Sequence, residues 1–391
     1  MEVSRQLRRS YPPCGHARRG ILVRPLLFVV VVSALFLAIV GRTDAHKPVT
    51  SKYDYNRDVF PLLREHCARC HVQSGAAPMS LMTYKDAVPW AQSIRDELTA
   101  GRMPPWPIDS TSPAVTGAHP ISSRDLDMIV VWASGGTPEG NPDTKLPAAT
   151  SSDQQWGLGP PDLKIPLDAE RTVAPGTIEE NSEVSLSTNL SDTKWVKAAD
   201  LMPGNASIVR DAVISIENGP VLALWEPGSD AIALPSGTAF RLAAGSKLHV
   251  LIHYKKHFDQ EQNAVSDKST IGLYFTDPPA SGHELQSLAV EPSEGHKLAN
   301  PVRLVALRPM LDRAYELMSI EAITPAGMHI PILRLRGPRP QWPRRYWLQQ
   351  PVELAGGSQI NVTVKPLSDY SDEPKFTRPV RLQVGLDYVA Q

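Results

Sequence analysis

The most informative motif in the sequence is a run of five residues, Cys67-Ala68-Arg69-Cys70-His71. The two cysteines are three positions apart, so one helical turn would present both thiols on the same side. Cys-x-x-Cys-His is the attachment pattern of a c-type haem, whose two vinyl groups form thioethers with such thiols. The imidazole of His71 would then be the fifth iron ligand. The sequence therefore predicts one covalent haem c and, with it, an electron carrier.

Two other uses of a Cys-x-x-Cys pair fit the sequence less well. A structural zinc site needs four ligands, and only two cysteines follow the N-terminal hydrophobic stretch. A thioredoxin-like motif needs a strand before it and a βαβ setting, whereas Arg64 and Glu65 precede the motif in a helical pattern. Covalent haem remains the prediction.

The sixth iron ligand is predicted to come from Gly101-Arg102-Met103-Pro104-Pro105-Trp106. Prolines keep this segment extended and reduce the entropy lost when the Met103 thioether is fixed over the haem. Methionine and histidine together would raise the reduction potential and favour plain electron transfer. An open iron is an alternative, and the competing side chains are Met79, Met82, Met128, His66 and His119.

Three helices are expected around the motif. Apolar residues at helical spacing indicate a short helix over Asp58–Cys67 and a second over Lys85–Thr99. The third begins at an N-cap, Ser122 or Ser123, and stops at Gly135-Gly136. Residues 46–140 are therefore expected to form a small all-α cytochrome c domain.

The first 45 residues resemble a targeting segment, with arginines followed by the apolar run Leu26–Val40 and a small-residue cleavage site at Thr43-Asp44-Ala45. The run has 15 residues, which leaves open a cleaved signal peptide or an uncleaved inner-membrane anchor. In both cases the remainder is expected to be exported to the periplasm. The 40 basic and 41 acidic side chains nearly cancel, which gives no support for nucleic-acid binding.

The remainder of the chain is predicted to be rich in β-strands. Residues 141–155 are rich in Pro, Gly, Ser and Thr and are expected to be a linker. Short alternating segments separated by turn residues then favour two antiparallel β-sandwiches, over residues 156–280 and 281–391. The predicted strands are Ala212–Ile216, Val221–Trp225, Lys247–Tyr254, Thr270–Phe275, Pro301–Arg308, Tyr315–Ala322, Ile330–Arg336, Arg345–Leu348, Gln359–Lys365 and Val380–Leu386.

A family resemblance runs from Tyr53 to the C-terminus. The haem motif, Met103-Pro104-Pro105-Trp106 and the Trp132–Gly140 segment resemble the cytochrome c domain that bacterial exported proteins carry fused to a copper type II ascorbate-dependent monooxygenase-like module. The landmarks of that module here are Trp156–Asp162, Met202-Pro203-Gly204-Asn205, Trp225-Glu226-Pro227-Gly228, Ala244-Gly245-Ser246 and Leu251-Ile252-His253-Tyr254. The resemblance implies two sandwiches with one copper on each, as in peptidylglycine hydroxylating monooxygenase.

Most of the copper ligands that the resemblance implies are absent. The His-His pair of the family is replaced by Arg210-Asp211, and the late methionine has no counterpart in Gly385–Val389. The third histidine corresponds to His253, and the His-Met-His element survives only in His329 of Gly327-Met328-His329. A guanidinium cannot coordinate copper, so copper is not expected and His253 and His329 are residual positions without activity.

Three features of this region leave alternatives open. One face of a strand would carry three histidines, His249, His253 and His257. A new metal site formed by them is therefore an alternative. Arg210 and Asp211 are candidates for an ion pair at the former copper position. The basic aromatic stretch from Arg334 to Trp347 either docks an acidic partner or forms a solvated loop, and the sequence favours the loop.

The function expected is electron transfer to or from a redox protein partner, or within a larger membrane complex, with the β module as scaffold or docking domain and no catalytic residue. The alternative is a copper-dependent monooxygenase-like enzyme fed by the haem. A third interpretation is a structural subunit whose haem is mainly a folding core.

Overall fold

The computed structural model describes residues 50–149, 155–280, 283–292, 295–367 and 381–391. All of the described residues belong to one compact unit, Thr50–Gln391. The predicted targeting segment lies outside the described residues. Over the described ranges, no helix has the length and apolar character needed to cross a membrane.

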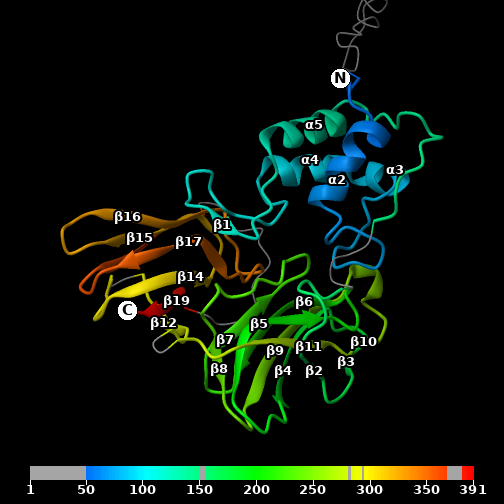
Figure 1. Ribbon diagram of the computed structural model, residues 1–391. Helices are drawn as coiled ribbons and strands as arrows, with labels where there is room; N and C mark the ends of the chain where they lie inside the picture. The colour runs from blue at the N-terminus through cyan, green and yellow to red at the C-terminus, as the bar shows by residue number, and fades with distance from the viewer. Residues whose placement is uncertain (1–49, 150–154, 281–282, 293–294, 368–380) are drawn as a thin grey trace, which may run out of the picture. The chain divides into compact units, whose positions relative to one another are not determined.

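The α-helices are confined to the N-terminal third of the described chain (Figure 1). Their side chains share one hydrophobic core, in which Tyr55, Leu63, Ile129 and Trp132 are fully buried. The helical elements of this region are η1 (Tyr55–Val59), α2 (Phe60–His66), α3 (Tyr84–Ala87), η2 (Val88–Trp90), α4 (Ala91–Thr99) and α5 (Ser123–Ser134). One further 3₁₀ turn, η4 (Phe258–Gln260), lies in the β-rich region.

Capping and proline explain where these helices begin and end. The Ser122 hydroxyl accepts a hydrogen bond from the amide of Asp125, so α5 begins at Ser123 as predicted. The helix expected over Lys85–Thr99 is instead three short elements. Pro89 has no N–H to donate, and the backbone around it is a turn of 3₁₀-helix between α3 and α4.

Most of the remaining regular structure is antiparallel strand, which confirms the prediction of a β-rich chain. Two four-stranded sheets come first along the sequence, ordered β2-β11-β5-β8 and β4-β9-β6-β7. Their strands are β2 (Leu163–Pro166), β4 (Glu179–Ser187), β5 (Lys194–Met202), β6 (Val209–Ile216), β7 (Val221–Trp225), β8 (Phe240–Leu242), β9 (Lys247–Lys255) and β11 (Thr270–Thr276).

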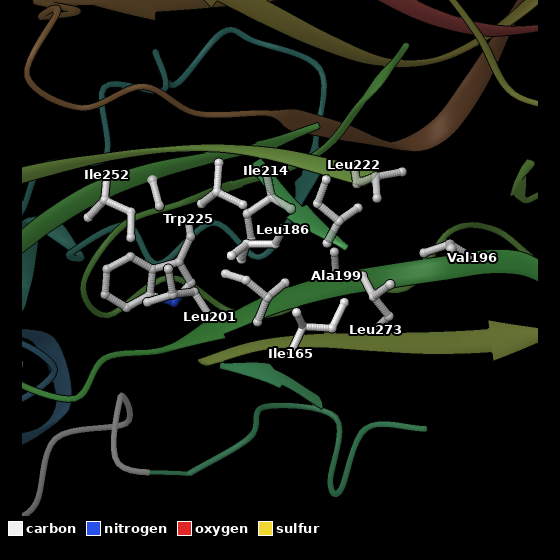
Figure 2. Close-up of a cluster of buried hydrophobic side chains, with 14 of the residues drawn as sticks. Ile165, Leu186, Val196, Ala199, Leu201, Ile214, Leu222, Trp225, Ile252 and Leu273 are labelled. Atoms are coloured by element: carbon white, nitrogen blue, oxygen red, sulfur yellow. The ribbon is translucent and has the colours of Figure 1, made fainter. Parts of the chain in front are cut away.

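Both of these sheets contribute to one core (Figure 2). Ile165 and Leu273 come from the first sheet, whereas Leu186, Ile252 and Trp225 come from the second. In β9, for example, Leu248, Val250 and Ile252 are buried at every second position, as the two-residue period of a strand requires. Two short strands from the same part of the chain, β3 (Arg171–Val173) and β10 (Val265–Asp267), form a separate antiparallel pair.

The later part of the chain forms a second hydrophobic core, contributed by a five-stranded sheet ordered β1-β17-β14-β19-β12 and a four-stranded sheet ordered β13-β18-β15-β16. The strands are β1 (Val115–Thr116), β12 (Gln286–Val290), β13 (His296–Lys297), β14 (Val302–Met310), β15 (Tyr315–Ile323), β16 (His329–Arg336), β17 (Tyr346–Leu354), β18 (Gln359–Pro366) and β19 (Gln383–Ala390).

The segment that joins α4 to α5 is part of this later sheet structure. Strand β1 pairs with β17 through Val115 opposite Leu348. The amide of Asp109 donates to the carbonyl of Arg334 over 3.0 Å, and its buried carboxylate pairs with Arg336 at 2.9 Å. The loop that carries Met103 is therefore held at its far end by strands from the C-terminal half of the chain.

Candidate functional site

The Cys-x-x-Cys-His stretch forms one tight turn directly after α2. Cys67 is the C-cap of that helix, and its amide donates to the carbonyl of Leu63 over 2.8 Å. The amide of His71 donates to the carbonyl of Cys67, also over 2.8 Å, which closes a turn with helical spacing. Both thiols are half-buried and neither is in a disulfide, and burial raises the pKa of Cys67 to about 12.

The chain beyond His71 folds back over this turn. The amide of Ala77 donates to the carbonyl of Cys70, and the amide of Leu81 donates to the carbonyl of His71. Gly75 makes the close approach possible, because a Cβ atom there would lie 2.4 Å from the Cys70 carbonyl oxygen. The motif is thus held by backbone contacts on both sides.

The imidazole of His71 has a defined tautomer. Its Nδ1 lies 3.2 Å from the carbonyl oxygen of Met79, which can only accept, so Nδ1 carries the proton. Burial lowers the pKa of His71, with the Met79 contact opposing that effect, and the ring is therefore neutral. A neutral imidazole whose Nδ1–H is bound to a carbonyl presents the Nε2 lone pair to a metal.

These features fit a c-type haem. The turn supplies two unbridged thiols at the required spacing and an imidazole with its ligand nitrogen available, which is what attachment and axial ligation need. Cys67, Cys70 and His71 are the residues that would hold the group.

Met103 lies between α4 and the Asp109 anchor and is half-buried. Its amide donates to the carbonyl of Glu97 over 3.3 Å, and the neighbouring Arg102 pairs with the Glu97 carboxylate at 2.6 Å. The peptide bond between Met103 and Pro104 is cis. Ligation by its thioether stays a prediction.

The competing side chains have neighbours of their own. His119 Nε2 lies 2.6 Å from a carboxylate oxygen of Asp230, and its ring stands edge-on to Trp106. His66 lies 3.6 Å from the carboxylate of Asp125. Met79 and Met82 pack against the helical core, as expected of ordinary apolar residues.

A loop of the β-sheet region packs directly on the Cys-x-x-Cys turn. The Sγ atom of Cys70 lies 3.5 Å from the carbonyl oxygen of Pro227. Arg69 donates to the carbonyl of Gly228 over 2.9 Å and pairs with the carboxylate of Asp230 at 2.7 Å. A further contact joins His257 Nε2 to the carbonyl oxygen of Ala76, 3.0 Å apart. The Trp-Glu-Pro-Gly landmark at 225–228 therefore contributes directly to this site.

The Met103 loop has its own contact with the sheets, through Arg344. The guanidinium of Arg344 stacks 3.6 Å from the centroid of the Trp106 ring and donates to the carbonyl of Pro105. The same group pairs with the buried carboxylate of Glu226. Burial raises the pKa of Glu226 to about 7, and the positive charge of Arg344 acts in the opposite direction.

A cavity of about 60 Å³ adjoins this contact, lined by Trp106, Glu226 and Arg344 among others. A polar cavity of this size has room for a few water molecules. Within the described ranges, Glu226 Oε2 has no hydrogen-bond partner, and a water in the cavity would supply one.

Arg345 is also buried and pairs with Asp387 at 2.9 Å, so the prediction of a solvated loop is wrong for Arg344 and Arg345.

His253, the first residual copper position, is engaged at both ring nitrogens. Nδ1 lies 2.8 Å from a carboxylate oxygen of Asp211, and Nε2 lies 2.7 Å from a carboxylate oxygen of Glu179. An ionised carboxylate only accepts, so both nitrogens act as donors when the two bonds are made. This arrangement leaves no lone pair on the ring for copper.

His329, the second residual position, is exposed at the start of β16 and pairs with Glu321 at 3.2 Å. His253 and His329 belong to different sheets. His249 pairs with Glu183, and His257 lies past the end of β9, so the three histidines of that stretch have separate partners. Across the described ranges, no three His, Cys, Asp or Glu side chains are grouped to hold a metal ion.

Comparison with known proteins gives no assignment. No protein-family model matches the chain, and no curated protein matches it. A solved α-L-fucosidase-like protein from Bacteroides ovatus is 11% identical over 68% of this chain, with a TM-score of 0.19, and the chain spans only 42% of its length. A turret protein of Sulfolobus turreted icosahedral virus is 12% identical over 58% of this chain and 97% of its own, with a TM-score of 0.15. TM-scores this low carry no argument about fold or activity.

Proposed function

We propose that this chain is an exported monohaem c-type cytochrome that carries electrons to or from a redox partner, or within a larger complex. The supporting observation is the turn Cys67–His71, with two unbridged thiols and an imidazole whose Nδ1 is bound to the Met79 carbonyl. A turn that served only to stabilise the fold would need neither the two unbridged thiols nor the oriented imidazole. The helical region around it is proposed to be the cytochrome c domain.

Each residue has a distinct part in this proposal. Cys67 and Cys70 bind the haem covalently, and His71 Nε2 is the fifth ligand. Met103 is the sixth, on a loop braced by Arg344 and Asp109. A bound haem c supplies a one-electron iron couple. The chain's own residues bind it, orient it and shield its attachment edge from water.

The β region is proposed to be a degenerate two-sandwich module of the copper monooxygenase type, acting as scaffold or docking domain. In support, its 227–230 loop packs on the haem-attachment turn. The engagement of His253 by Asp211 and Glu179 further supports a module that transfers no oxygen. Its partner would be a redox protein or a membrane complex, with periplasmic location given by the N-terminal segment.

The test is to express the full chain in a host that attaches haem c and purify the exported protein. We expect covalent haem that resists acid-acetone extraction, one iron per chain, and no copper. The variant Cys67→Ala with Cys70→Ala should lose the covalent haem, whereas Cys14→Ala should keep it. A wild-type protein without covalent haem contradicts the proposal. Stoichiometric copper that is lost in His253→Ala would instead favour the oxidative enzyme.

A further inference from the structure

Asp230, in the loop after β7 at residues 226–230, contacts two segments that are distant from each other in sequence. One of its carboxylate oxygens accepts a hydrogen bond from Arg69 Nη1 over 2.7 Å, and the other lies 2.6 Å from His119 Nε2. Arg69 is part of the Cys-x-x-Cys-His turn, whereas His119 and Met103 both belong to the segment that joins α4 to α5. One side chain of the β region therefore bridges the turn and that segment.

The Asp230 carboxylate is ionised at neutral pH. Partial burial raises the pKa of Asp230, but its contacts with Arg69 and His119 outweigh that effect and hold the pKa below its usual range. An ionised carboxylate accepts hydrogen bonds at both oxygens, so it can bind a donor on each side at the same time. Hydrogen bonds to a charged group are also stronger than neutral ones.

The contact with His119 extends to the residues beside Met103. The ring of His119 stands edge-on to the ring of Trp106, with the two centroids 5.2 Å apart. Only two prolines separate Trp106 from Met103. Because a proline ring fixes the backbone φ angle, this short stretch is stiff, and holding Trp106 in place restricts Met103 as well.

The other end of the same loop makes a second link between the two segments. Glu226 pairs with Arg344, whose guanidinium donates to the carbonyl of Pro105 over 2.9 Å. The next residue of the loop, Pro227, has its carbonyl oxygen 3.5 Å from Cys70 Sγ. The loop after β7 therefore contacts the Cys-x-x-Cys-His turn and the Met103 segment near both of its ends.

We propose that Asp230 is a positioning residue for the iron ligands, which holds the segment of Met103 in register with the turn of His71. The inference rests on the proposed function, because it needs a haem iron bound by both residues. A ligand that the fold already holds in place loses little conformational freedom when it binds. Without Asp230, the thioether should therefore be displaced more easily by an added ligand.

The experiment measures how tightly the oxidised, haem-loaded, full-length protein binds added imidazole, which competes with the Met103 thioether for the iron. We expect Asp230→Ala to bind imidazole about three- to tenfold more tightly than the wild type, because the segment is released from the iron more often. Its thioether-to-iron band should weaken in parallel. Asp230→Asn should fall between the two, because its amide can form both contacts but only as weaker, neutral hydrogen bonds.

Asp312→Ala is the matched control. Asp312 is another partly buried aspartate of the β region, and its partners Arg313 and Tyr315 are its neighbours in sequence. The substitution removes the same charge without touching the Met103 segment or the Cys-x-x-Cys-His turn. Its imidazole affinity should equal that of the wild type.

The outcomes separate this inference from the proposed function. A wild-type protein without haem overturns both. A haem-loaded Asp230→Ala variant with the imidazole affinity of the wild type overturns only the role of Asp230. Should Asp230→Ala fail to fold, His119→Phe keeps the ring against Trp106 and Arg69→Met keeps an unbranched side chain, and each removes one contact of Asp230. Unchanged imidazole affinity in both variants would also contradict the inference.

Discussion

Cys70 Sγ lies 3.5 Å from the carbonyl oxygen of Pro227, a residue 157 positions further along the chain. Around this contact, Arg69 reaches both the carbonyl of Gly228 and the carboxylate of Asp230. The Cys-x-x-Cys-His turn and the loop after β7 are therefore one packed unit, and substitutions in that loop should alter the structure of the turn.

Gly228→Ala tests how closely the two segments pack. A Cβ atom at residue 228 would lie 2.7 Å from the Cβ of Arg69 and 3.2 Å from Cys70 Sγ, at a φ of +73°. Crowding and backbone strain together should lower the free energy of unfolding by about 2–4 kcal/mol. Gly159→Ala is the matched control, since its φ is +76° with nothing within 4 Å, and it should cost about 1–2 kcal/mol. Equal losses in urea denaturation would contradict the close packing.

Arg69 and Asp230 should show energetic coupling. Their charged atoms are 2.7 Å apart and both side chains are partly buried, so a double-mutant cycle to alanine should give about 0.5–1 kcal/mol. The pair Lys365 and Glu316, also 2.7 Å apart but more exposed at both residues, is the comparison and should give close to zero. A coupling energy no larger for Arg69 and Asp230 would mean that the contact does not join the two segments.

His253→Ala and His329→Ala should differ strongly in stability. Removing His253 leaves the Asp211 carboxylate, whose side chain is 1% exposed, without its imidazole partner. A hydrogen bond to a buried charged group contributes about 1.5–3 kcal/mol, and the variant should lose about that much of its free energy of unfolding. His329 has a side chain that is 61% exposed, so its replacement should change the free energy of unfolding by less than about 0.5 kcal/mol. Thermal and urea unfolding in metal-free buffer measure both, and equal effects would contradict a structural role for His253.

In the variant Asp109→Asn, the free energy of unfolding should fall less steeply than in the wild type as the pH decreases. Hydrogen bonds from the hydroxyl and amide of Thr111, and then Arg336, lower the pKa of Asp109 to about 2. A carboxyl whose folded pKa is below its unfolded value stabilises the fold above the unfolded pKa, near 3.8. That contribution is lost as the pH falls from about 4 towards about 2. Thr111→Val should shift this loss to higher pH, and parallel wild-type and Asp109→Asn curves would rule the contribution out.

Local signals in the sequence are sufficient to predict several helices and strands and insufficient to predict others. The Ser122 cap and the alternation over Val221–Trp225 predict α5 and β7 at the residues where they occur. The sequence of β4 has only Leu186 as a buried apolar residue, so its alternation is too weak to detect. Pro89, which has no N–H to donate, is the local signal for the break between α3 and α4.

The same distinction applies to the candidate site, where local sequence predicts some residues and long-range packing brings in the others. The spacing of Cys67, Cys70 and His71 predicts the attachment turn from neighbouring residues alone. Arg344 against Trp106 and Pro227 against Cys70 are contacts between residues more than 150 positions apart, which no local pattern encodes. The Trp-Glu-Pro-Gly landmark was the available signal, but its place in the site depends on how the sheets pack.

The most direct test of the central claim is an ultraviolet-visible spectrum of the purified exported protein, oxidised and dithionite-reduced, with iron and copper measured on the same sample. We predict a c-type reduced spectrum, a thioether-to-iron band in the oxidised form that is absent in Met103→Ala, one iron per chain and no copper. A protein with no haem spectrum and no iron would contradict the account.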